Sequence, residues 1–249
     1  MKYGFLSFFC FYMVSVLAQP TFFDIQRSFP RVAQASKTKL DTLKKQVEQV
    51  GLVWPIAQIY IRSFKYDSQL EVWGRNNSKE LFKLVKTYKI CALSGALGPK
   101  RIEGDYQVPE GFYEIDAFKP RSNYHLSLGI NYPNNSDMLL SDSVKPGKDI
   151  FIHGTCITVG CIPLMNEIEE LYLLAAQAKS QGQDFIPVHI FPVRFNRQKS
   201  VDFLTGYTKN DTDYLHFTKQ LKQVFDYFEK HKKLPLILIN QRGEYVLNN

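Results

Sequence analysis

A histidine and a cysteine lie close together in one short segment of this sequence, with a glycine next to each. The segment reads IHGTCITVGC over residues 152–161, so His153 precedes Gly154 and Cys161 follows Gly160. A cysteine needs a base to act as a nucleophile near neutral pH, because its unperturbed pKa is about 8.5 and little of it is thiolate. A glycine lets a substrate come close, and its positive φ can turn backbone N–H groups toward one point, as an oxyanion site requires. These are the residue types that cysteine acyl transfer needs.

The neighbouring residues must position this pair. The apolar run over residues 149–152 predicts a short strand that carries His153 at its end. The chain must then fold back as a loop to bring Cys161 beside the imidazole. Two other interpretations stay open on these residues alone. The pair can be purely structural, or His153, Cys156 and Cys161 can bind zinc, although there is no CxxC pair and no second histidine cluster nearby.

The residue pattern of this segment resembles a known catalytic signature. HG at residues 153–154 followed by TVGC at residues 158–161 resembles the HG…(S/T)xGC motif of YkuD-type L,D-transpeptidase catalytic domains. Upstream, GPKRIEGDYQVPEGFY at residues 98–113 is similar to the family's GPK…EGD…TPEGxY block. Two further segments look like the YafK-like branch of that family: HLSLGINYPN at residues 125–134 and PVHIFP at residues 187–192. The blocks occur in the family's order, and the resemblance covers residues 55–247.

The resemblance implies a fold and a role for each site residue. The implied fold is α+β and mainly β, the L,D-transpeptidase (YkuD-like) fold with mixed β-sheets, extended here by a C-terminal helix and hairpin. Cys161 would be the nucleophile and His153 its base, which many members orient through a backbone carbonyl. Backbone N–H groups around Gly160 and Cys161 would hold the oxyanion, and the hydroxyl of Thr158 would brace that loop. No metal and no organic cofactor is implied, since the acyl-enzyme carries the intermediate.

The resemblance also implies a substrate, the peptidoglycan stem peptide, with a wall-linked protein as a further candidate partner. Cys161 would attack the carbonyl at the L-centre of a diaminopimelate residue. Two departures from the family pattern bear on the outcome: Pro163 stands where many members have arginine, and the spacing from His153 to Cys161 is shorter. Both favour the YafK-like branch, which includes hydrolases. We therefore expect an amidase outcome rather than 3→3 transpeptidation; the alternative class is a non-catalytic peptidoglycan-binding module.

Residues 1–18 predict a secretory signal peptide. An apolar run from Tyr3 to Leu17 follows a lysine, and small residues precede the boundary after Ala18. The run is short for a transmembrane span, although an uncleaved N-terminal anchor is the alternative. Cleavage would start the mature chain at Gln19, in the periplasm or outside the cell. No later segment of the sequence is long and apolar enough to predict a transmembrane helix.

A secreted chain has its cysteines in an oxidising compartment, which favours disulfides. Cys10 would leave with the signal peptide, so Cys91, Cys156 and Cys161 would remain. An odd number implies one free thiol or an intermolecular bridge. The chemistry above needs Cys161 free, which leaves Cys91 and Cys156 available to each other. Two buried free thiols are the equal alternative.

The composition is that of a globular protein. Of the 249 residues, 45% are hydrophobic and 22% are charged, and a chain of this length can bury a sizeable core. The net charge of +7 is spread along the sequence without a dense basic block, so we expect no nucleic-acid partner. After the signal, we expect an N-terminal helical extension over residues 19–54 and a catalytic domain over residues 55–249, which includes the C-terminal helix and hairpin.

Hydrophobic periodicity predicts the elements around the site. Helices are expected over residues 36–50, 166–179 (with Asn166 as N-cap) and 211–231. Strands are expected over residues 56–62, 69–74, 81–92, 112–118, 124–131 and 185–191, with a closing hairpin over 234–240 and 244–247. The polar face of the strand before the motif presents His125, and Tyr132 follows it, so both are candidates for the substrate pocket. His189, in a buried strand, is expected to be structural.

Overall fold

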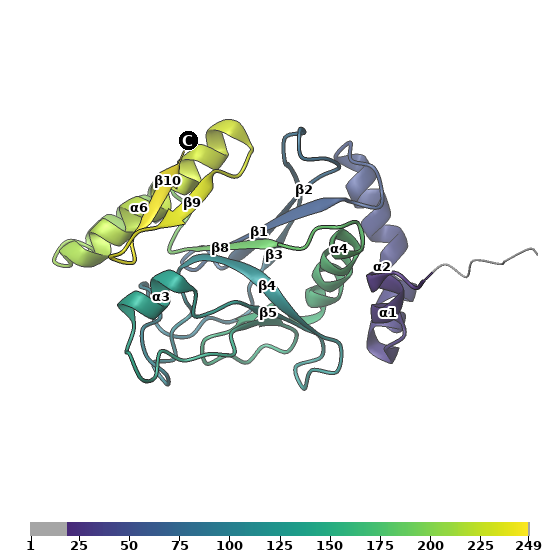
Figure 1. The fold of residues 1–249 in the computed structure, drawn as a ribbon, viewed down its shortest axis with the longest axis horizontal. Helices are drawn as coiled ribbons and strands as arrows, with labels where there is room; N and C mark the ends of the chain where they lie inside the picture. Colours follow the sequence, from purple (N-terminus) through teal and green to yellow (C-terminus); the bar gives the residue numbers. More distant parts are fainter. Residues whose placement is uncertain (1–18, 249) are drawn as a thin grey trace, which may run out of the picture.

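One mixed sheet of eight strands forms the centre of the molecule (Figure 1), as the computed structural model of residues 19–248 shows. The strand order is β3-β2-β1-β8-β4-β5-β6-β7. Neighbouring strands are antiparallel except for two parallel pairs, β1 with β8 and β6 with β7. The bounds are Gln58–Phe64 for β1, Gln69–Arg75 for β2, Lys83–Lys89 for β3, Gly111–Lys119 for β4, Ser127–Ile130 for β5, Phe151–His153 for β6, Ile162–Pro163 for β7 and Pro187–Phe191 for β8. The predicted signal peptide lies outside the described residues.

Three helices pack together at one end of the sheet. Helix α4, Ile168–Ser180, is buried along most of its length, because α1 (Phe22–Arg27) and α2 (Pro30–Gln49) pack on it. Thr21 and Asp24 form a capping box that starts α1, and proline stands at the first position of α2, where it costs no hydrogen bond. The predicted N-terminal extension is thus packed against the helix that follows the Cys161 segment.

The C-terminal region lies at the opposite end of the molecule (Figure 1). It consists of α5 (Gln198–Tyr207), α6 (Thr212–His231) and a hairpin of β9 (Leu236–Ile239) with β10 (Tyr245–Asn248). The side chain of Asp211 accepts the N–H of Tyr214 at 2.8 Å and caps α6. Phe225 of α6 packs on Phe64 and Phe191 of the sheet, which closes a second hydrophobic core.

The expected class, α+β with a mixed sheet and a C-terminal helix and hairpin, is confirmed. Several individual elements differ from the expectation. Helix α2 begins at Pro30, well before residue 36. The strand expected over residues 124–131 covers only Ser127–Ile130, because His125 has a φ of 73° and belongs to the preceding turn.

The predicted cap of α4 is wrong. A 3₁₀ turn, Met165–Glu167, runs directly into this helix, so Asn166 lies within the turn and caps nothing. Three short helices were not expected: α1, α5 and α3, which spans Asn135–Leu140. The strand expected over residues 81–92 is confined to Lys83–Lys89.

Candidate active site

The β6–β7 pair places the two chemically important residues at the ends of neighbouring strands. Strand β6 ends at His153, which lies opposite Ser127 of β5 and Pro163 of β7. Cys161 directly precedes β7, so the parallel register puts it beside Phe151, which shares a strand face with His153. With strands about 4.8 Å apart and a rise of about 3.3 Å per residue, the Cα atoms of His153 and Cys161 lie about 8 Å apart. Side chains at that separation can act on the same substrate atom.

The free thiol of Cys161 lies at a cavity of about 310 Å³, here called the Cys161 cavity. Its Sγ accepts the N–H of Phe151 at 3.4 Å, and it can donate its proton to the carbonyl oxygen of Asp149 at 3.8 Å. Burial raises the pKa of this thiol, because a thiolate loses hydration there. The rest of the lining comes from three segments of the chain: Lys100, Glu103, Gly104, Tyr106, Gly147, Lys148, Asp149, Ile150, Val159 and Gly160.

The imidazole of His153 is buried, and its orientation is fixed by the backbone. Its Nδ1 is hydrogen-bonded to the carbonyl oxygen of Gly154. A carbonyl oxygen only accepts, so Nδ1 carries the proton and the lone pair of the neutral ring is on Nε2. Burial lowers the pKa of His153, since the cationic form loses hydration, and the neutral ring is the form that can take a proton. Tyr124 packs on this ring with centroids 4.8 Å apart.

Thr158 braces the loop that carries Cys161. Its hydroxyl accepts the N–H of Gly160 at 3.1 Å and donates to the carbonyl oxygen of Cys161 at 2.7 Å. Gly160 has a φ of 139°, and a Cβ there would lie 3.1 Å from the carbonyl oxygen of Gln107. A side chain at this position would therefore strain the backbone and crowd the neighbouring loop. The N–H of Gly160 already has a partner in Thr158, which the sequence could not indicate.

Gly154 of the HG pair is required by close packing. A Cβ at this residue would lie 2.8 Å from the carbonyl oxygen of Tyr124 and 2.9 Å from the Cβ of His125. The chain after β6 can therefore pass under the β4–β5 connection only because this residue has no side chain. This passage keeps Tyr124 against the ring of His153.

A disulfide between Cys91 and Cys156 ties the same loop to the end of β3, with Cα atoms 5.8 Å apart. The N–H of Cys91 also donates to the carbonyl oxygen of Pro163 at 3.1 Å, so the loop is anchored next to β7. The zinc alternative loses a ligand, because the sulfur of Cys156 is used in the disulfide. Within residues 19–248 no group of three or more His, Cys, Asp or Glu side chains is arranged to hold a metal ion.

The GPK…EGD block forms one wall of the Cys161 cavity. The buried ammonium of Lys100 forms an ion pair with Asp105 and donates to the carbonyl oxygen of Ile102 at 2.9 Å. The carboxylate of Asp105 also accepts the N–H of Gln107 at 3.0 Å. The block is thus a closed turn, and Gln107, two residues after Asp105, lies next to Gly160. Pattern matching located this block but assigned no site role to Lys100.

His125 and Tyr132 lie outside the lining of the Cys161 cavity. The Nε2 atom of His125 lies 2.8 Å from the carboxylate of Glu169 on α4. Tyr132 is buried, and its hydroxyl donates to the carbonyl oxygen of Pro146 at 2.8 Å, which supports the segment before β6. His189 is buried in β8, where its Nδ1 accepts the hydroxyl proton of Tyr60 at 2.8 Å, as expected of a structural residue.

Tyr124 is the residue that sequence reasoning missed. It lies in the connection between β4 and β5, far from the HG…GC motif in the sequence, yet it packs on the ring of His153. Its position depends on the turn around the positive φ of His125. The only sequence signal was its place directly before the YafK-like block.

A curated protein and several solved structures are similar to the chain. It is 33% identical over 193 residues to "Putative L,D-transpeptidase YafK" of Escherichia coli K12, an alignment that covers 76% of this chain and 74% of that protein. No family model matches the chain. Among solved structures it is similar to the helical cell shape determining protein Pgp2 of Campylobacter jejuni (21% identity, 80% of each chain, TM-score 0.43) and to L,D-transpeptidase 1 of Mycobacterium tuberculosis (10% identity, 53% of this chain and 61% of that one, TM-score 0.31). The similarity to YafK, over about three quarters of both chains, shows that this chain belongs to the L,D-transpeptidase family.

Proposed function

We propose that this protein is a cysteine acyltransferase or hydrolase of the bacterial cell wall that acts on peptidoglycan stem peptides. The observation that supports it best is the arrangement at β6 and β7. A free thiol at a cavity stands one strand away from an imidazole whose Nε2 is its unprotonated nitrogen. Family membership supports the substrate class, and the carbonyl attacked is that of a diaminopimelate residue.

The first half of the reaction forms a thioester. Nε2 of His153 takes the thiol proton while Sγ of Cys161 bonds to the carbonyl carbon of the scissile amide. The carbon–nitrogen bond then breaks, the proton on His153 passes to the leaving amine, and the acyl group stays on sulfur. The lowered pKa of His153 and the raised pKa of Cys161 both favour a neutral pair before substrate binds. Proton transfer therefore accompanies attack and does not precede it.

The tetrahedral oxyanion needs a hydrogen-bond donor at the base of the loop. The N–H of Gly160 is bonded to the hydroxyl of Thr158, so we assign the oxyanion contact to the N–H of Cys161 itself. In this assignment Gly160 and Thr158 set the backbone geometry of the loop and do not touch the substrate. His125 and Tyr132 likewise support neighbouring segments.

The second half of the reaction decides between hydrolase and transferase. Transfer needs an amine-bearing stem peptide held against the thioester, whereas hydrolysis needs only water. The loop between His153 and Cys161 is short, and the Cys91–Cys156 disulfide restrains it. Few residues of this loop are therefore available to bind an acceptor peptide. Pro163 offers no guanidinium to clamp a carboxylate. We therefore favour water as the acceptor, which makes the protein an amidase of a diaminopimelate bond.

The proposal includes the cell compartment. We infer that residues 1–18 are a signal peptide, that residues 19–54 are an extension and that residues 55–249 are the catalytic domain, in the periplasm or outside the cell. A disulfide beside the site supports an oxidising compartment. Among residues 19–248 no helix is long and apolar enough to cross a bilayer.

Substitution of the two reacting residues tests the proposal. Cys161→Ala and His153→Ala should each lower turnover of purified muropeptides by roughly three orders of magnitude or more, because each removes a reacting group. Mass spectrometry of the products measures this, and circular dichroism checks that each variant is folded. If the protein is a non-catalytic binding module, the unsubstituted chain should leave the muropeptides intact. Immobilised on a column, it should still retain them. Equal turnover by the unsubstituted and alanine chains would refute the mechanism.

A further inference from the structure

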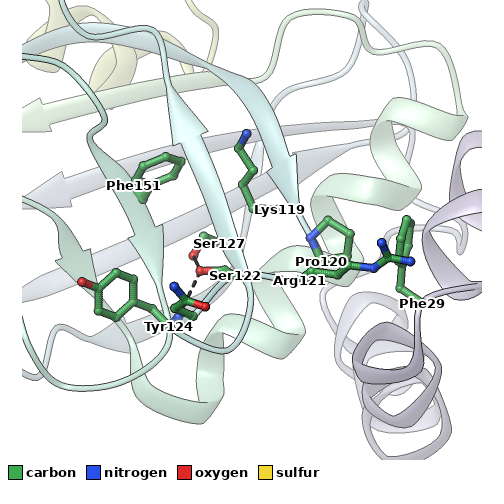
Figure 2. A pocket seen from close by; sticks show the side chains of 9 residues that line it. Phe29, Lys119, Pro120, Arg121, Ser122, Tyr124, Ser127 and Phe151 are labelled. Atoms are coloured by element: carbon green, nitrogen blue, oxygen red, sulfur yellow. Dashed lines mark hydrogen bonds between the residues drawn. The ribbon is translucent and has the colours of Figure 1, made fainter.

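A second cavity, of about 530 Å³, adjoins the candidate active site. We call it the Tyr124 cavity, and Figure 2 shows the side chains that line it. Its walls come from the β4–β5 connection, from β6 and from the residue at the start of α2. Its lining includes Phe29, Lys119, Arg121, Tyr124, Ser127 and Phe151. Its volume is in the range of cavities that bind small molecules.

Residues that line the Tyr124 cavity contact both His153 and Cys161. Tyr124 packs on the ring of His153, with centroids 4.8 Å apart. Ser127 pairs with His153 in the β5–β6 register. The backbone N–H of Phe151 is hydrogen-bonded to Sγ of Cys161 at 3.4 Å, and Phe151 lines the Tyr124 cavity while Cys161 lines the other one. A peptide whose scissile carbonyl lies at Cys161 can therefore extend into this second space.

The walls of this cavity are held in place by hydrogen bonds. The hydroxyl of Ser127 donates to that of Ser122 at 2.6 Å, and Ser122 in turn accepts the N–H of Tyr124 at 3.1 Å (Figure 2). The guanidinium of Arg31 in α2 donates to the carbonyl oxygens of Ser122 and, at 2.7 Å, of His125. The β4–β5 connection is thus fastened both to itself and to the N-terminal extension. The cavity is preorganised, which lowers the cost of binding.

Two cationic side chains, Lys119 and Arg121, line the otherwise mostly apolar wall of the Tyr124 cavity. The guanidinium of Arg121 lies 5.0 Å from the ring centre of Phe29, and it is not a member of any ion pair found within residues 19–248. Lys119 is likewise in none of these ion pairs, although burial raises the pKa of the nearby Asp116 and the charge of Lys119 offsets part of that rise. Figure 2 shows Arg121 beside Phe29, with Lys119 between that pair and Phe151. Cations without an acidic partner beside an apolar surface favour an anionic ligand with an aliphatic portion.

We propose that the Tyr124 cavity binds the stem peptide next to the scissile amide and that Arg121 and Lys119 recognise a free carboxylate of that peptide. The inference rests on the proposed function and gives that site its specificity. Diaminopimelate has two carboxyl groups, so a residue joined through one can still present the other. Arg121 supplies a guanidinium, which can bind a carboxylate through two parallel hydrogen bonds. Phe29 makes the N-terminal extension part of the substrate site.

The test measures binding separately from chemistry. A diaminopimelate stem peptide, and the same peptide with its free carboxylates amidated, are titrated by calorimetry into the mature chain carrying Cys161→Ala. The titrations are repeated with Arg121→Gln and Lys119→Gln added together, and with Lys37→Gln as a control on the exposed side of α2. The paired substitution should raise the Kd of the free-acid peptide at least tenfold, about 1.4 kcal/mol. It should leave the Kd of the amidated peptide within about twofold, since neutral amides gain nothing from the cations.

Kinetics with Cys161 restored give a second readout. The Arg121→Gln/Lys119→Gln chain should have a raised KM for the free-acid peptide and a kcat close to that of the unsubstituted chain, because the two cations bind and do not react. Equal Kd values for the two peptides, or an unchanged Kd in the paired variant, would overturn the inference and leave the roles of Cys161 and His153 untouched. Conversely, carboxylate-dependent binding without any turnover by the unsubstituted chain would support the cavity assignment and refute the proposed catalysis.

Discussion

At the scale of single residues, burial favours the neutral forms of both members of the proposed reacting pair, Cys161 and His153. Burial raises the pKa of the Cys161 thiol and lowers the pKa of the His153 imidazole. Both directions oppose a thiolate–imidazolium pair. The carbonyl oxygen of Gly154 fixes the proton on Nδ1 and so leaves Nε2 to accept the thiol proton. A neutral thiol is also less easily oxidised than a thiolate.

The neutral pair predicts how alkylation depends on pH. The rate at which iodoacetamide modifies Cys161 should rise in a single step whose midpoint lies above that of a free thiol, because the reactive thiolate forms only at high pH. His153 is neutral at pH 7, so no plateau of reactivity should occur between pH 5 and 8. Intact-mass measurements over a pH series give the rates, with Cys161→Ala as the unreactive control. A plateau near neutral pH would mean a preformed ion pair.

Thr158 offers a test of the loop brace. Replacing it with valine leaves the N–H of Gly160 and the carbonyl oxygen of Cys161 without their shared hydroxyl, which costs about 1–3 kcal/mol. Because the loss distorts the backbone at Cys161, Thr158→Val should lower kcat about tenfold. The kcat of Thr158→Ser, which keeps the hydroxyl, should stay within about threefold of that of the unsubstituted chain. Steady-state kinetics on muropeptides compare the two. A loss in Thr158→Ser as large as that in Thr158→Val would contradict the brace, because serine keeps the hydroxyl.

At the scale of elements, the sequence indicated the strand end and the loop but not what surrounds them. The apolar run before His153 and the glycine motif predicted β6 and the return to Cys161, because both signals are local. Tyr124 and Arg121 lie in the β4–β5 connection, and β4 itself changes register against β5 between Ile115 and Ala117. Such tertiary placement leaves no periodic signal. Helices α1, α3 and α5 were missed because none exceeds ten residues, too few to set a helical period.

The disulfide is an element-scale constraint on the catalytic loop. In the denatured, unreduced mature protein, thiol labelling should find one reactive group, Cys161, because Cys91 and Cys156 are bridged. Replacing either bridged cysteine with serine should lower the free energy of unfolding by about 2–4 kcal/mol, and the double replacement should cost little more, since one bond is lost in each case. Urea denaturation measures these values. Three labelled thiols, or additive losses, would contradict the bridge.

At the scale of the whole molecule, the N-terminal helices and the catalytic strands form one continuous structure. Helix α4 follows β7 after the 3₁₀ turn and is covered by α1 and α2, while Arg31 and Phe29 reach the β4–β5 connection. The extension is therefore expected to support both the stability and the substrate specificity of the site. The family resemblance in the sequence begins only near residue 55, so motifs could not predict that the N-terminal helices contact the site.

In the proposed reaction, Cys161 forms a thioester with a diaminopimelate carbonyl and water hydrolyses it. The most direct measurement digests purified sacculi with the mature chain in water enriched in heavy oxygen, followed by mass spectrometry of the muropeptides. Hydrolysis predicts a newly freed diaminopimelate carboxyl that carries one heavy oxygen atom, few new cross-linked dimers, and none of these products with Cys161→Ala. Unlabelled cross-linked dimers as the main product would make the protein a transferase, and the same products with and without Cys161 would contradict the claim itself.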